Sequence, residues 1–126
     1  MFEEVVQRGT GRPGSAEVAE AKWIHRHEVR DAASVERLSA RVGRGEAEAI
    51  VLASEVAADV LVIDDAVARR LAEAEGRRVV GLPGLLTYGK QHRVLTEIKS
   101  VLDDMRAAGF FLDEPRYQAL LRQAGE

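Results

Sequence analysis

The chain of 126 residues has the length of one ordinary domain, and its 46% hydrophobic and 31% charged residues are typical of a globular protein. A net charge of −3 gives no overall attraction to nucleic acid, so a polyanionic partner would need a local basic patch. Because cysteine is absent, disulfides, thiolate zinc sites and cysteine nucleophiles are excluded, and any metal must be bound by oxygen or imidazole ligands.

We expect a cytoplasmic protein with no membrane partner, folded as a single domain over residues 1–126. No apolar run approaches the ~20 residues that span a bilayer. At the amino terminus, Met1 and Phe2 lead directly into Glu3 and Glu4, where a signal peptide would have a basic region and a long apolar stretch.

The first part of the chain predicts two helices and a strand. Residues 1–8 have the pattern of a helix that Gly9 ends, and Ser15 is placed to cap a short helix through Lys22. From Trp23 to Val29, apolar and polar residues alternate as they do in a half-exposed strand.

The middle of the chain alternates helices with strands. Asp31 caps a predicted helix that extends to about Val42, and Glu46 to Ala58 has the alanine-rich pattern of a second helix. The continuous apolar run Val60–Ile63 is typical of a buried strand.

The next segment completes this alternation. Asp64 or Asp65 begins a helix that ends at Gly76, and Arg78 to Gly81 follows as another short strand. Connections this short favour helices that cross between parallel strands, so the pattern predicts an α/β fold with a short parallel sheet covered by helices.

The remaining chain is predicted to be helical, with segments at Gly84–Gln91, Val94–Ala107 and Pro115–Ala124. Apolar residues follow a helical stripe there and are joined by an aromatic pair. We expect this set to form core, although it would equally bury a partner helix. Its members are Val94, Ile98, Val101, Leu102, Met105, Phe110 and Phe111.

Acidic residues follow the central strand and open the helix before it. Glu46 and Glu48 lie at a helix start, and Asp64 and Asp65 come directly after Val60–Ile63. Ligands bind beyond the carboxyl ends of strands in open parallel sheets. Carboxylate oxygens gathered there are the ligands that Mg²⁺ or Mn²⁺ prefers, and such a metal can activate water and neutralise a phosphodiester's developing charge.

The residues alone leave other interpretations open. Glutamates at a helix start favour the positive end of its dipole, and Asp64 is an ordinary helix cap. His25 and His27 would face one side of a strand, but without a third ligand nearby they are expected to be surface histidines. The arginines after the acidic pair would meet phosphates or lie on a solvated helix face. These are Arg69, Arg70, Arg77 and Arg78.

Several motifs together resemble the PIN-domain superfamily. They are Glu46–Ile50 after a glycine, Ala58–Asp65 with its strand and acids, and Gly76–Gly81 after the next helix. More narrowly, the sequence is similar to the PilT-N-terminus-like branch, which is related to toxin ribonucleases of toxin–antitoxin systems. Phe2–Val6 and Met105–Phe110 extend the resemblance over nearly the whole chain.

This resemblance implies a metal-dependent endoribonuclease in which Mg²⁺ or Mn²⁺ activates water for in-line attack on an RNA phosphodiester. Matched residue by residue, Glu4 falls at the early helix acid and Glu46 at the acid opening the middle helix. Asp64 or Asp65 falls at the acid after the strand, with Glu48 as a neighbour. An antitoxin protein is the partner that the resemblance implies.

The chain departs from the family pattern at its start. PIN domains begin with an apolar strand ending in an aspartate that is a principal metal ligand, and this sequence has neither. Losing one acid from such a cluster weakens metal binding and catalysis, so we expect weak or absent activity. Losing the first strand also leaves Val60–Ile63 with an unpaired edge, so the chain either rearranges its sheet or pairs with a second copy, and we expect a homodimer. The alternative is a non-catalytic oligomerisation or antitoxin-binding module with the same fold.

Overall fold

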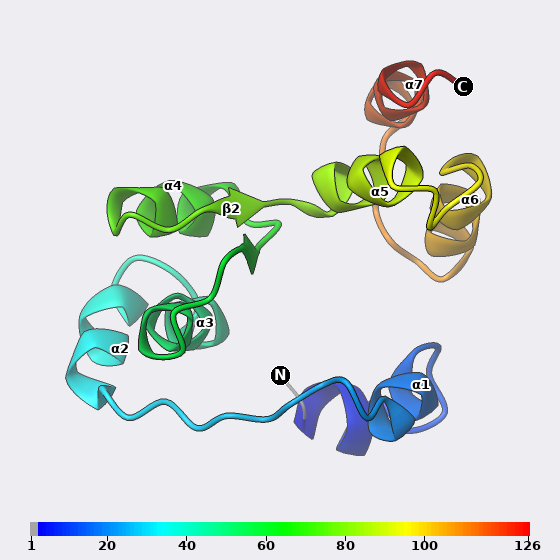
Figure 1. Cartoon of the computed structure of the whole chain (residues 1–126). Helices are drawn as coiled ribbons and strands as arrows, with labels where there is room; N and C mark the ends of the chain where they lie inside the picture. Colours follow the sequence, from blue (N-terminus) through cyan, green and yellow to red (C-terminus); the bar gives the residue numbers. More distant parts are fainter. Residues whose placement is uncertain (1–2) are drawn as a thin grey trace.

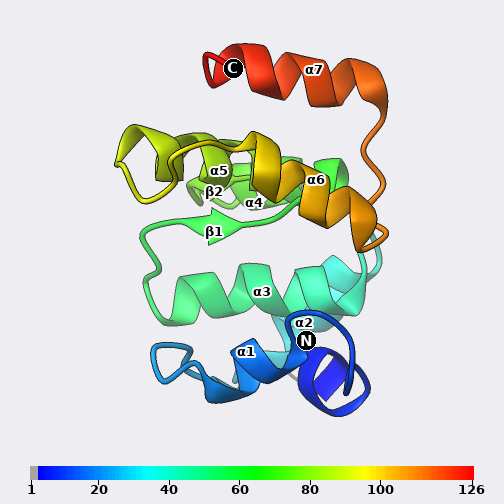
Figure 2. The same ribbon diagram turned by 90° about the vertical axis from the view of Figure 1, so that its right-hand side faces the viewer.

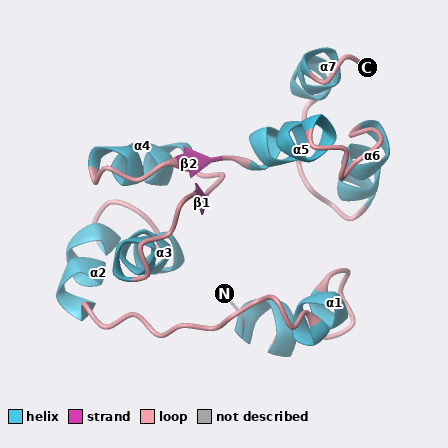
Figure 3. Ribbon diagram, viewed as in Figure 1, coloured by secondary structure: helices cyan, strands magenta, loops and turns pink. Residues whose placement is uncertain are grey.

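The computed structural model describes residues 3–126, and the helices and strands that it contains are shown in Figure 3. In chain order they are η1 (Glu3–Gln7, a π-helical turn), α1 (Ser15–Glu20), α2 (Ala32–Ser39), α3 (Arg44–Glu55), β1 (Leu61–Val62), α4 (Ala66–Ala74), β2 (Val79–Val80), α5 (Leu82–Gln91), α6 (Lys99–Ala107) and α7 (Glu114–Gln123). The predicted α/β class with a helical carboxyl-terminal part is confirmed.

The sheet consists of β1 and β2, which pair in parallel with Leu61 opposite Val79. The amide of Leu61 donates to the carbonyl of Arg78 at 2.8 Å, and that of Ile63 donates to Val80 at 3.0 Å. Helix α4 provides the crossover between the strands (Figure 2). Both predicted strands are therefore confirmed, although each is shorter than its predicted range.

The amino-terminal predictions are only partly confirmed. Helix η1 occupies the described part of the predicted helix over residues 1–8, whose first two residues lie outside the described range. Ser15 is not a cap: Gly14 precedes α1, and Ser15 is its buried first residue. The strand predicted from Trp23 to Val29 is wrong, because this segment pairs with no strand among residues 3–126. Apolar and polar residues do alternate in this segment, but a strand forms only where a second strand lies beside it to accept its hydrogen bonds.

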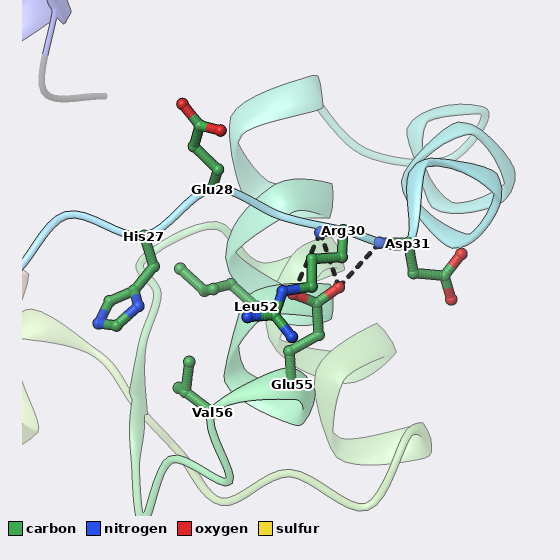
Figure 4. A pocket seen from close by; sticks show the side chains of 7 residues that line it. All are labelled: His27, Glu28, Arg30, Asp31, Leu52, Glu55 and Val56. Carbon is green, nitrogen blue, oxygen red and sulfur yellow. Dashed lines mark hydrogen bonds between the residues drawn. The ribbon is translucent and has the colours of Figure 1, made fainter.

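One side chain ties this segment to the rest of the fold. The carboxylate of Glu55, at the end of α3, accepts the amides of Arg30 at 2.9 Å and Asp31 at 2.8 Å. Figure 4 shows these bonds beside a hollow that His27 and Val56 also line. The clamp positions Asp31, whose own carboxylate caps α2.

Two hydrophobic cores organise the chain. The first, called the sheet core, lies between α2, α3, α4 and the strands, where small and branched side chains pack closely. Ala47, Ala68 and Ala72 are completely buried, and Ile50 is 1% exposed. The members of the sheet core are Val35, Leu38, Ala47, Ile50, Val51, Ile63, Ala68, Leu71 and Ala72.

The second core, called the helical core, joins α5, α6 and α7, which stand apart from α2 and α3 in Figure 1. Its members are Leu86, Ile98, Leu102, Tyr117, Leu120 and Leu121. The predicted stripe is therefore partly wrong. Ile98 and Leu102 are buried, but Val94 is 77% exposed because it precedes α6 in a turn, and the phenylalanine pair is also exposed.

Candidate functional site

The two aspartates after β1 have different local roles. Asp65 is the N-cap of α4 and accepts the amide of Ala68 at 2.7 Å. Asp64 instead reaches the next helix, where its Oδ1 atom accepts the amide of Leu82 at 2.7 Å. Gly81, the N-cap of α5, has no side chain that could do this. The predicted capping role thus belongs to Asp65, while Asp64 links the end of β1 to the start of α5.

A cation lies beside Asp64. A Cβ atom placed on the buried Gly81 would be 3.1 Å from Nη1 of Arg69 and 3.3 Å from Oδ1 of Asp64, so both side chains converge on this glycine. Arg69 is half-buried on α4. Among the described residues, no hydrogen bond or ion pair is formed with its guanidinium. A half-buried cation without a carboxylate partner favours an anion from outside the chain.

These residues line a crevice of about 390 Å³ between the sheet core and the helical core. It lies beyond the carboxyl ends of β1 and β2, where a parallel sheet places its ligands. Polar groups on its wall are Asp64, Arg69 and Arg116, and aromatic side chains are Phe110 and Phe111. Its floor is apolar and is made of Leu82, Pro83, Leu86, Leu102, Leu112, Ala119 and Leu120.

The other predicted acids lie on other elements. Glu46 is in the first turn of α3, with its carboxylate folded against Gly43. Glu48 pairs with Arg44 at 3.0 Å along the same helix, as an ordinary i,i+4 ion pair does. Glu4 is an exposed residue of η1. None of these three lines the crevice that holds Asp64.

Sequence reasoning missed several residues of the crevice. Arg69 was one of four arginines for which phosphate contact was only one interpretation, and nothing in the sequence separated it from the others. Arg116 follows the predicted helix start by one residue and carries no motif. The helical stripe predicts Phe110 and Phe111 as core or as a surface that buries a partner helix, and the structure leaves both exposed. Gly109 is the one sequence signal for their position, because a glycine with a left-handed conformation ends α6 and places Phe110 and Phe111 beyond the helix.

Comparison with protein families shows to which family the chain belongs. The family DUF3368, described as a PIN domain, matches residues 1–126. The chain belongs to this PIN-domain family. No curated protein and no solved structure matches it. The resemblance drawn from the acidic motifs is thereby confirmed, and membership gives this chain a fold of the nuclease type.

The predicted metal ligands of this PIN domain are not gathered at one point among the described residues. Among residues 3–126, no group of three or more histidine, aspartate and glutamate side chains lies close enough to hold one. Asp64 and Asp65 each have one oxygen engaged by a backbone amide. Magnesium and manganese sites need several oxygen ligands around one point. The metal centre and its ligand set therefore stay predictions, and this conformation does not assemble them.

Within the described part of this PIN domain, no helix is both long and apolar enough to cross a membrane. The longest described helix, α3, has 12 residues and carries Glu46 and Glu48.

Proposed function

We propose that this PIN domain is a ribonuclease-type module of toxin ancestry that binds RNA in the crevice beside Asp64, and that its hydrolytic activity in this form is weak or absent. The carrying observation is the half-buried Arg69, unpaired among the described residues, at the carboxyl end of the parallel strands. Family membership supplies the nuclease-type fold.

The electrostatics of the crevice suit a phosphate. The guanidinium of Arg69 offers several donors in a planar fork, which matches phosphate oxygens. The start of α5 lies beside it and adds the positive end of a helix dipole. The Asp64 carboxylate opposes an anion, but its hydrogen bond to the Leu82 amide draws its charge toward the backbone. One phosphate beside Arg69 and away from Asp64 is the arrangement we expect.

Weak hydrolysis follows from the scattered acids. A PIN nuclease uses Mg²⁺ or Mn²⁺ to activate water, and such chemistry requires the acids to act on one ion. Here Glu46 and Glu4 lie outside the crevice that contains Asp64. RNA binding is therefore the activity that the arrangement of residues supports best, with cleavage dependent on acids that this conformation does not bring together.

Binding and cleavage assays test the proposal separately. Arg69→Ala is expected to weaken binding of a single-stranded oligoribonucleotide about tenfold, because one charge-assisted contact is lost. Arg70→Ala, on the exposed face of the same helix, is the matched control and should have little effect. Equal binding by the wild type and Arg69→Ala would contradict the proposed site. Cleavage should be near background with Mn²⁺, and any cleavage that Glu46→Gln and Asp65→Asn leave unchanged would exclude those acids.

A second candidate function is supported by a different surface. Val60, Val62, Leu85 and Tyr88 are 43%, 51%, 43% and 58% exposed around one hollow on the strands and α5. Exposed apolar side chains gathered together favour a protein partner. The alternative is therefore a non-catalytic module that forms a homodimer or binds an antitoxin. Sedimentation showing a stable dimer, with no RNA binding at micromolar protein, would favour it.

A further inference from the structure

The aromatic pair at the crevice has no structural role that explains its exposure. Phe110 is 41% exposed and Phe111 is 84% exposed, and both line the crevice that contains Arg69. Leaving a phenylalanine in water costs the free energy that burial would provide. Two adjacent exposed rings beside an unpaired cation therefore point to a ligand that covers them.

The turn that carries the pair is well defined. Gly109 adopts a left-handed conformation with φ of 94° and donates its amide to Arg106 at 3.0 Å. The amide of Phe110 then donates to the carbonyl of Met105 at 2.9 Å. This pattern is a Schellman motif, which fixes the direction of the chain after a helix. Phe110 thus directly follows the capped end of α6, and Phe111 is the next residue in the connection to α7.

The following helix holds the other side of this turn. The Asp113 carboxylate accepts the amide of Arg116 at 2.8 Å and so caps α7. The Arg116 guanidinium lies 3.6 Å from the same carboxylate, with a side chain that is 77% exposed. A pair this open to solvent is weak and leaves the cation available to a ligand. Cations thus lie on the crevice wall together with the rings.

We propose that Phe110 and Phe111 form a stacking surface for unpaired bases of the strand whose phosphate Arg69 binds. The inference rests on the proposed function and adds the features of RNA that the site reads. Every base has a π face, and aromatic side chains stack on bases that are not already paired. Arg69 contacts a phosphate of the same strand, and Phe111, the more exposed ring, contacts a base.

A protein partner fits the same surface less well. An apolar helix laid over the phenylalanines would remove water from Arg69 without supplying an anion, and burying an unpaired cation is costly. A nucleic acid covers the rings and neutralises the cation at once. The charge of the crevice therefore favours RNA as the occupant.

Fluorescence anisotropy with labelled 12-nucleotide probes tests the inference on the full chain. The probes are a single-stranded RNA, the matching duplex, and an abasic sugar–phosphate strand of equal length. We expect the wild type to bind the single strand most tightly, and Phe111→Ala to weaken that binding about tenfold. The same variant should leave binding of the abasic probe unchanged. Trp23→Ala, which removes a ring that is 79% exposed and does not line the crevice, is the matched control.

Each outcome separates the inference from the proposed function. If Arg69→Ala weakens RNA binding and Phe111→Ala does not, the stacking surface is overturned while the RNA site stands. If the duplex or the abasic strand binds as tightly as the single-stranded RNA, stacking of unpaired bases on the rings is overturned. If no RNA binds but Phe111→Ala abolishes self-association seen by sedimentation, both proposals fail and the surface is a protein interface. Circular dichroism checks that Phe111→Ala remains folded.

Discussion

The sheet core and the helical core are stabilised by different interactions. The sheet core is made of apolar side chains, with Ala47, Ala68 and Ala72 allowing close approach of helices to strands. The helical core adds hydrogen bonds between charged and polar groups. Glu126 accepts the amides of Ile98 at 2.8 Å and Lys99 at 3.1 Å, and Tyr117 donates to Asp103 at 2.6 Å.

Because of this difference, we expect the stability of the two cores to depend differently on pH. Apolar burial does not titrate, so the buried packing of the sheet core should itself depend little on pH, and the carboxylates that accept backbone amides around it, such as Glu55 and Asp65, lie at its edge. Hydrogen bonds to carboxylates titrate with their acceptors. The amide of Ile98 and then Lys90 lower the pKa of Glu126, and Lys99 and then Tyr117 lower the pKa of Asp103. On the other side, Asp31 has a lowered pKa through Ser34, but it lies at the edge of α2 and not in the core.

The largest expected effect is a cavity in the sheet core. Ile50→Ala removes a side chain that is 1% exposed, and we expect a loss of about 2–5 kcal/mol in the free energy of unfolding. Leu102→Ala makes the matched change in the helical core, where the side chain is also 1% exposed. Urea denaturation followed by circular dichroism measures both. Loss of less than 1 kcal/mol for Ile50→Ala would mean that the sheet core is not close-packed.

A smaller effect is expected at the cap of α4. Asp65→Ala removes the acceptor of the Ala68 amide and should cost about 0.5–2 kcal/mol of stability. Asp65→Asn should retain most of it, because asparagine caps as well as aspartate. Thermal unfolding compares the two variants. Equal destabilisation by both would show that charge, and not capping, is what Asp65 contributes.

The hydrogen bonds that the Glu126 carboxylate accepts from the amides of Ile98 and Lys99 should make the helical core sensitive to acid. A carboxyl group with a lowered pKa adds stability above its ordinary pKa of 4.5, and this stability is lost as the pH falls through the folded-state pKa. At pH 7 we expect Glu126→Gln to lower Tm by about 4 °C. Glu97→Gln, on an exposed side chain nearby, is the control.

Hydrogen exchange followed at pH 7 and again below pH 4 resolves this acid effect by region. Protection should fall first in α6 and α7 and last in α3, after correction for the intrinsic rates. At high pH the sign is opposite for Tyr117, whose hydrogen bond to Asp103 raises its pKa above 10.0, so its contribution is lost as the pH rises through the folded-state value. Uniform loss of protection at acid pH would contradict the contrast between the cores.

The smallest effect belongs to the surface ion pair on α3. Arg44 and Glu48 have side chains that are 71% and 43% exposed, so Glu48→Gln should change stability by about 0.3–0.5 kcal/mol at most. Denaturation at low and high salt measures it, since screening should remove the difference. A larger loss, independent of salt, would give Glu48 a role beyond its pair.

Local signals allowed much of the sheet region to be predicted from the sequence. The apolar run at Val60–Ile63, the cap at Asp65 and the stop at Gly76 each act within a few residues, and β1 and α4 follow them. The predicted strand at Trp23–Val29 failed because strand formation depends on a partner far away in sequence. The alternation of apolar and polar residues is a property of one segment, whereas strand pairing requires two segments to meet in the folded chain.

The candidate site was less predictable for the same reason. Spacing placed Asp64 correctly at the end of β1, but gave no information on whether Glu4 and Glu46 would meet it. The exposure of Phe111 depends on which elements cover the connection between α6 and α7, and the lack of a partner for Arg69 depends on where the carboxylates of other elements lie in the folded chain. Both are properties of the assembled chain. The acidic residues alone therefore indicate the Asp64 side of the crevice and not the side with Phe110 and Phe111.

The clamps that join the elements also bear on how the chain reaches its fold. Asp64 and Leu82 are 18 positions apart, Arg30 and Glu55 are 25 apart, and Ile98 and Glu126 are 28 apart. The entropy lost on closing a loop grows only with the logarithm of its length, so these closures have similar and modest costs. Segments that find partners within such distances favour rapid folding, and each half of the chain has the contacts to begin it separately.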